Sequence, residues 1–182
     1  MPSTYPSPTH LALHANAFDM KGFKTWEGRD GVGYQFALTF GGVPVAQVTE
    51  HGNGGCLRVD WLGVTRSGAP MPLEPDATPA QRKKAAVQAA QTVKALAALA
   101  SILASLPDID LGHGIVVKAN EDIVLGSLVE VADIRKLTKK KTVFADGGAL
   151  YTMSTPYTAA VAAHLATKRP TAVVLNTIPV YV

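Results

Sequence analysis

Cysteine is almost absent from this chain, which has one, Cys56, among 182 residues. A single cysteine cannot form an internal disulfide, and it excludes a cysteine-rich zinc cluster. Charged residues are also scarce, at 17% of the chain, whereas they make up about a quarter of an ordinary globular protein. The formal charge of +3 and the isoelectric point near 9.0 give a mild positive field, which is weaker than that of a dedicated nucleic-acid-binding protein.

Long hydrophobic runs are missing as well. The longest uncharged helical run covers residues 95–107, which is short of the roughly 20 residues that span a bilayer. Residues 1–8 are polar and rich in proline, without the basic start and apolar run of a secretory signal. These absences predict a cytoplasmic protein that has no part in a membrane.

Apolar residues make up 47% of the chain, which is enough for a packed core. The prolines and hydroxyl residues at the start predict a disordered tail over residues 1–9. The remaining length suits one core, so residues 10–182 are predicted to form a single domain.

The clearest local signal is the stretch Thr78-Pro79-Ala80-Gln81. It combines a threonine suited to cap a helix, a proline at the first helical position and a glutamine at the capping-box position. A long helix should therefore begin at Pro79 and end near Leu106, before Pro107. Its first half is amphipathic and its second half is almost entirely apolar.

The rest of the chain alternates between strand and helix patterns, which predicts the α+β class. An antiparallel meander should cover about residues 23–62, with a tight hairpin at Gly41-Gly42. A helix should run from near Asn120 to near Thr138, and another should begin at Thr155-Pro156. A hairpin over 142–153 and a last strand over 171–178 should join the meander in one sheet, with one long and two shorter helices on one face.

Cys56 follows two glycines, and His51 lies five residues before it. One interpretation is a nucleophile with a base, because a reactive thiol needs a nearby cation or base and Arg58 shares its predicted face. The other interpretation is a hairpin corner, where glycine supplies positive φ and cysteine is a small filler. No known cysteine-enzyme motif surrounds Cys56, so it and His51 are weak catalytic candidates.

The densest group of basic residues could follow a phosphate backbone. It could equally be a solvated helix end, where the helix dipole favours cations. Its members are Arg135, Lys136, Lys139, Lys140 and Lys141. No aromatic side chain lies among them, so a stacking platform for single-stranded nucleic acid is not indicated.

The apolar second half of the long helix offers more hydrophobic surface than one small sheet requires. It is therefore a candidate surface for a partner protein or for a second copy of the chain. The predicted contact residues are Leu99, Ile102, Leu103 and Leu106.

Two blocks, over residues 27–62 and 139–177, together resemble a group of small proteins found mainly in bacteriophages and prophages. The Gly-Gly-Cys corner and the Lys-Lys-Lys-Thr strand entry carry the resemblance. The group has no assigned activity, so no catalytic residues follow from it. The resemblance implies an accessory role in infection, such as interference with host defence, in the cytoplasm of the host cell.

No acid, base, nucleophile or metal-ligand set occurs at a recognisable spacing, and no cofactor or metal is expected. The sequence therefore predicts a non-enzymatic protein that binds a host macromolecule, most simply a protein, with self-association also open. Nucleic-acid binding through residues 135–141 and an enzyme that depends on Cys56 are the two alternatives.

Overall fold

The computed structural model describes residues 7–65, 67–110 and 115–182. Its internal contacts divide the chain into two compact units. We call residues 13–105 and 120–122 the meander unit, and residues 7–12, 106–119 and 123–182 the C-terminal unit. The sequence predicted one domain over 10–182 and not this division.

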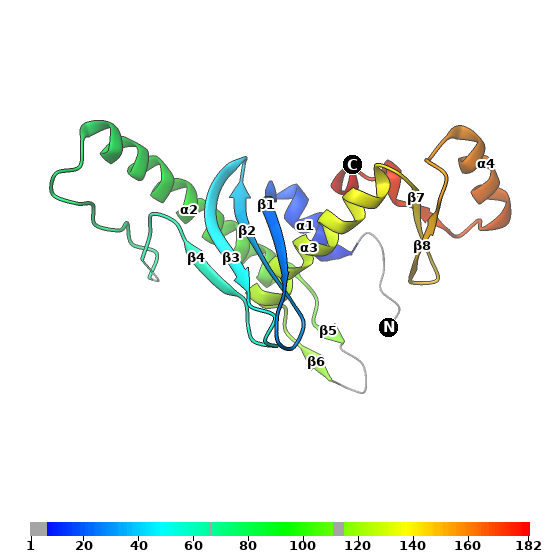
Figure 1. The fold of residues 1–182 in the computed structure, drawn as a ribbon, viewed down its shortest axis with the longest axis horizontal. Coiled ribbons are helices and arrows are strands. Elements are labelled where there is room, and N and C mark those ends of the chain that lie inside the picture. The colour runs from blue at the N-terminus through cyan, green and yellow to red at the C-terminus, as the bar shows by residue number, and fades with distance from the viewer. Residues whose placement is uncertain (1–6, 66, 111–114) are drawn as a thin grey trace. The chain divides into compact units, whose positions relative to one another are not determined.

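The meander unit contains a four-stranded antiparallel sheet in the order β1-β2-β3-β4, as predicted (Figure 1). The strands are β1 (Phe18–Glu27), β2 (Val32–Phe40), β3 (Val43–Glu50) and β4 (Arg58–Trp61). Gly41 and Gly42 have φ values of 57° and 80°, the backbone that a two-residue hairpin turn requires. Phe36 and Leu38, which lie two residues apart on one face of β2, are fully buried.

Helix α2 (Pro79–Ser105) is also confirmed, and it packs on the sheet at β3. Its capping box forms as predicted: Gln81 N donates to Thr78 Oγ1, and Thr78 N donates to Gln81 Oε1 at 2.7 Å. The first turns of α2 extend past the sheet, where a loop over residues 63–77 runs beside them (Figure 1). By length and composition, α2 could also cross a membrane, a property that it shares with core helices of soluble proteins.

The C-terminal unit holds a three-stranded antiparallel sheet in the order β8-β7-β9. Its strands and helices are α3 (Glu121–Thr138, whose first two residues belong to the meander unit), β7 (Thr142–Asp146), β8 (Ala149–Met153), α4 (Ala159–Lys168) and β9 (Val173–Val174). Two 3-10 turns, Leu175–Thr177 and Pro179–Tyr181, follow β9, and β5 (Ile109–Asp110) pairs with β6 (Val116–Val117). The α+β class is therefore confirmed, but the C-terminal strands form their own sheet and do not join the meander.

Two local predictions for this part of the fold were wrong. Helix α4 is capped by Thr158 and not by Thr155, because the main-chain oxygen of Thr155 accepts hydrogen bonds from Thr142 at the start of β7. The last strand has two residues, since the side chain of Asn176 bonds to Val143 N in place of a further ladder bond.

The predicted tail falls partly on residues 1–6, which lie outside the described residues. The rest of it contradicts the prediction, because helix α1 (Pro8–Ala15) begins at Pro8. Ser7 caps this helix, since its Oγ accepts a hydrogen bond from His10 N at 3.1 Å. Proline at the first helical position suits such a start, so the proline-rich stretch marks a helix N-terminus here.

Candidate binding groove

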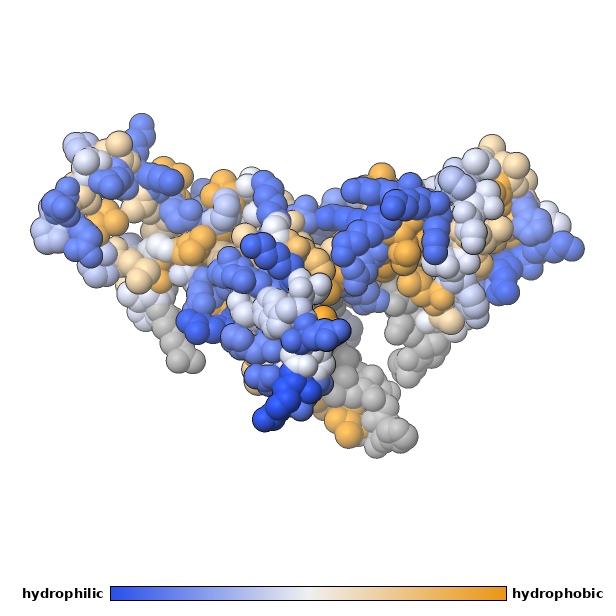
Figure 2. Space-filling view, in the orientation of Figure 1, coloured by the Kyte–Doolittle hydropathy of each residue, from blue (hydrophilic) through white to orange (hydrophobic). Residues whose placement is uncertain are grey.

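An open apolar groove lies in the meander unit, between α2 and the loop over residues 63–73. Its volume is about 560 Å³. The helix wall consists mainly of small side chains, and the loop wall carries larger ones; the lining residues are Gly63, Pro70, Met71, Leu73, Arg82, Ala85, Ala86, Ala89, Ala90, Val93 and Lys94. Figure 2 shows apolar atoms exposed between hydrophilic ones over α2 and the loop before it.

The opposite side of α2 fixes the helix wall to the sheet. The hydroxyl of Thr92 donates to the main-chain oxygen of Leu62 at 2.7 Å and lies 3.4 Å from that of Val45. Gln91 donates to Phe40 O at 3.0 Å, and Gln88 donates to Pro44 O. These polar side chains occupy the sheet-facing side of α2, so the alanine side is left for the groove.

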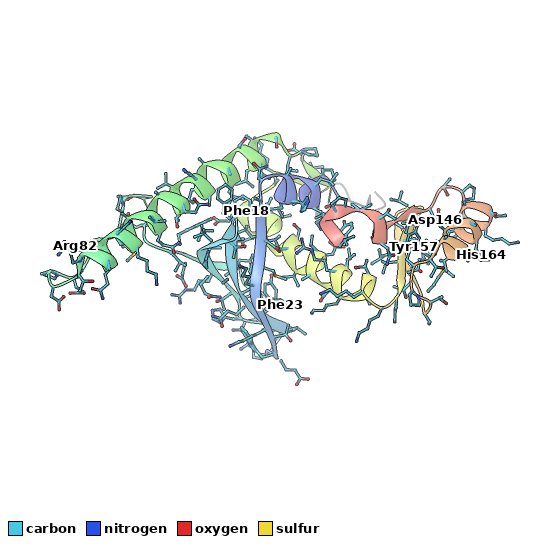
Figure 3. The ribbon with its side chains drawn as sticks, turned by 90° about the horizontal axis from the view of Figure 1, so that it is seen from above. Phe18, Phe23, Arg82, Asp146, Tyr157 and His164 are labelled. Carbon is cyan, nitrogen blue, oxygen red and sulfur yellow. The ribbon has the colours of Figure 1, made fainter. Side chains whose placement is uncertain are left out.

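The loop wall is held at both of its ends. Within the loop, Met71 N donates to Gly63 O at 2.9 Å. At the end that leads into α2, Arg82 donates from Nε to Ala77 O and from its terminal nitrogen to Pro75 O, both at 2.9 Å. Arg82 lies in the first turns of α2, at the end that extends past the sheet (Figure 3). The Arg82 bonds connect the two walls at this end, and the bond from Thr92 to Leu62 O connects α2 to the start of the loop wall.

The groove is apolar inside and positive along its helix wall. Val93 and Met71 remain 45% and 53% exposed, although both are large and apolar. Arg82 and Lys94 make no ion pair within the described part of the chain. The lining consists of apolar side chains and the two cations Arg82 and Lys94, a composition that suits contact with an apolar surface.

A second cleft of the same unit, with a volume of about 920 Å³, contains Trp61, Glu121 and Asp122. Burial raises the pKa of Glu121, and the charge of Asp122 adds to this effect, while a hydrogen bond from Trp61 opposes it. The Oε1 atom of Glu121 is buried and accepts no hydrogen bond from the described residues. One carboxyl group with a raised pKa could serve as an acid, but no histidine or cysteine is among the residues that line this cleft. Among the described residues, no three His, Cys, Asp or Glu side chains are arranged to hold a metal ion.

The docking surface predicted on the second half of α2 needs correction. Leu99 and Ile102 are 3% and 2% exposed in the single chain, so neither side chain can meet a partner without unfolding. Leu103 and Leu106 are half-buried. The apolar surface that α2 leaves open lies instead on its first half, at the groove.

Cys56 and His51 are both exposed on the loop between β3 and β4. No hydrogen bond joins the two side chains in the described structure. Gly52 and Gly54 have φ values of 71° and 69°, so the glycines serve the loop backbone. Gly52 also accepts a hydrogen bond from Asp30 N at 2.8 Å and lies against Gly28, where any side chain would collide with it. The geometry agrees with the corner interpretation of this stretch.

The predicted basic group lies at the end of α3 and in the turn after it. Arg135 donates to Val180 O, and Lys136 pairs with Asp133 at 3.0 Å. Lys139 and Lys140 are exposed, and Lys141 is half-buried.

The sheet that follows contains an aromatic pair, Phe144 stacked on Tyr151 with ring centroids 5.4 Å apart. The guanidinium of Arg169 lies 4.9 Å from the centroid of the Tyr151 ring, and it forms an ion pair with Asp146. Hydrogen bonds from Thr171 and Arg169 lower the pKa of Asp146. Because the ring already has a cation against it, this pair is not an open stacking platform.

His10, spaced four residues from His14 on α1, has a structural role. Its ring is buried, with Nδ1 2.6 Å from the hydroxyl of Tyr181 and Nε2 3.4 Å from Glu130. These contacts tie α1 to α3 and to the C-terminus within the C-terminal unit. These contacts give His10 a role in packing within the C-terminal unit.

The sequence contained part of the signal for the groove. Ala85, Ala86, Ala89, Ala90 and Val93 share one face of α2, and their spacing is that of a helical stripe. The loop wall had no such signal, because nothing periodic places Met71 and Leu73 opposite this stripe.

Comparisons with known proteins add no relative to this picture. No protein-family model, no curated protein and no solved structure matches the chain.

Proposed function

We propose that this chain acts by binding a partner protein and not by catalysis, with the groove between α2 and residues 63–73 as its binding surface. The observation that carries the proposal is an apolar lining that stays open to solvent, with Val93, Met71 and Leu73 all more than 40% exposed. Exposed apolar side chains that gather in one place mark interaction sites, whereas scattered ones do not.

The structure of the walls supports this proposal. Both walls are connected to each other and to the sheet by hydrogen bonds, so the groove is formed before a partner arrives. A preformed surface loses less conformational entropy on binding than a loose one. The resemblance to phage proteins predicts that the partner is a protein of the host cell, which stays a prediction, as does the cytoplasmic location.

The two alternatives have less support. Arg135 and Lys136 of the basic group already have partners in the chain, which leaves three lysines for a nucleic acid. Cys56 lies on an exposed loop without a bonded base.

A photo-crosslinking amino acid at Val93 tests the proposal in cells that make the protein. We expect covalent adducts with a partner from this position and none from Thr167, an exposed residue of α4. The variant Ala90→Glu places a charge in the groove and should abolish the adducts. Val87→Glu is the matched control, because Val87 is 58% exposed on the same helix outside the groove. Equal adducts from Val93 and Thr167 would contradict the proposal.

A further inference from the structure

We propose that the groove binds an amphipathic α-helix of about three turns that carries acidic side chains near both of its ends. This inference rests on the proposed function and specifies the partner of the same site. It follows from the length of the groove, the hydrogen-bonding state of its walls and the placement of its charges.

The length of the groove follows from its two end residues. Arg82 and Lys94 are twelve residues apart in the sequence of α2. At 1.5 Å per residue, that separation is about 18 Å along the helix axis. A partner helix that lies along this wall therefore contacts it over about twelve residues.

The walls favour a helix over an extended strand. Residues 79–105 form one continuous α-helix, so the main-chain groups of the helix wall are bonded within α2. On the loop wall, Met71 N donates to Gly63 O and Thr65 N donates to Ala69 O. An extended peptide binds well where it can add a strand to an unpaired edge. Here it would find few main-chain partners, whereas a helix satisfies its own.

The shape of the walls determines the size of the side chains that a partner can insert. The helix wall of the groove is made mainly of alanines, which let another helix approach closely. Helices pack with their axes about 8–10 Å apart, and the distance depends on the side chains at the contact. The space between the alanines of the helix wall and Met71 and Leu73 of the loop wall therefore accepts large apolar side chains from the partner. On a helical partner these side chains lie at the i, i+3, i+4, i+7 spacing of an amphipathic face.

The charges select against a second copy of this chain. Two α2 helices paired antiparallel would bring Arg82 close to Lys94 of the other copy, and a parallel pair would bring each cation to its own equivalent. Like charges in contact disfavour both arrangements. A partner with carboxylates at these positions is favoured instead. Glu74 and Asp76 lie in the loop next to the hydrogen bonds of Arg82, so the preference for an acid should be stronger at the Lys94 end.

A yeast-displayed library of randomised 16-residue helical peptides tests this inference on the full-length protein. Peptides are selected on the wild-type chain and counter-selected on the Ala90→Glu variant. We expect enriched peptides with a helical apolar stripe and with Asp or Glu about twelve residues apart. Enriched peptides with basic or uncharged ends, or with strand-like alternation, would overturn this inference and leave the proposed function standing. No enrichment over the Ala90→Glu variant would overturn the proposed function itself.

A charge exchange then checks the role of Lys94. Lys94→Gln should weaken a selected acidic peptide about 2- to 5-fold, the range of an exposed ion pair, while Lys84→Gln on another face of α2 should leave its affinity unchanged. Lys94→Glu should restore binding when the matching Glu of the peptide is replaced by Lys. If the exchanged pair binds no better than either single change, the acidic ends are not what the groove recognises.

Discussion

Thr92, in the middle of α2, and Leu62, the residue after β4, are joined by a 2.7 Å hydrogen bond in which the threonine hydroxyl is the donor. Leu62 directly precedes Gly63, where the loop wall of the groove begins. One bond therefore fixes the helix wall to the point at which the loop wall leaves the sheet. Thr92 is fully buried, so water cannot replace this interaction.

Replacing Thr92 with valine should lower the free energy of unfolding by about 1–2 kcal/mol, because the shape is kept while the main-chain oxygen of Leu62 loses its donor. Urea unfolding measures the effect. The control is Thr167→Val, which removes a hydroxyl that bonds to Ala163 O on an exposed helix. Equal losses from the two changes would show that the bond to Leu62 has no special role.

Asn176 should be the most sensitive polar residue of the C-terminal unit. Its Oδ1 accepts from Val143 N, and its Nδ2 donates to Thr138 O and Lys141 O. Asn176→Ala leaves all three groups without this partner and should lower the free energy of unfolding by about 2–3 kcal/mol.

Asn53→Ala is the control for this measurement, because Asn53 is exposed on the loop after β3. It should change the free energy of unfolding by less than about 0.5 kcal/mol. An Asn176 variant as stable as the Asn53 variant would contradict the account of how β9 ends.

Glu121 should make stability depend on pH. Burial raises its pKa in the folded chain above the usual 4.5, so the folded state binds a proton that the unfolded state has already lost. The contribution to stability is full below pH 4.5 and is lost as the pH rises through the folded pKa. Glu121→Gln should therefore gain stability relative to the wild type between about pH 4.5 and pH 7.

Unfolding midpoints at several pH values give this difference directly. The control is Glu74→Gln, since Glu74 is exposed on the loop before α2. Its midpoint should follow that of the wild type at every pH. A constant gap between the wild type and Glu121→Gln across the range would show that the Glu121 carboxyl does not titrate with folding.

Cys56 should react freely with maleimide in the folded protein, because its side chain is exposed. Cys56→Ser should change the free energy of unfolding by less than about 0.5 kcal/mol and leave the crosslinks from Val93 intact. Loss of those crosslinks in the serine variant would show that the Cys56 thiol takes part in partner binding.

Local patterns predicted the elements whose signals lie within a few residues. The Thr78–Gln81 capping box and the Gly41-Gly42 turn need only their neighbours in the sequence, and both formed as expected. Thr155 failed as a cap because Thr142, thirteen residues earlier at the start of a strand, donates to its main-chain oxygen. No pattern near Thr155 contains that information.

The candidate site shows the same difference between local signals and tertiary contacts. The alanine stripe of α2 is visible in the sequence, but the burial of Leu99 and Ile102 depends on tertiary packing. From the sequence, the apolar second half of α2 was therefore predicted to be a contact surface, whereas it belongs to the core. The first half had the pattern of an ordinary amphipathic surface helix. Only the position of Met71 and Leu73 beside the alanines turns that surface into a groove.

Gly63 differs from the rest of the groove in how much change it can tolerate. Its φ of 73° disfavours any side chain, and a Cβ there would come within 3.1 Å of Ala89 N. The side chains of Ala86 and Ala90, by contrast, are exposed methyl groups that form no hydrogen bond. Related chains could therefore vary the residues at the positions of Ala86 and Ala90, and with them the choice of partner, while Gly63 and the rest of the fold stay the same.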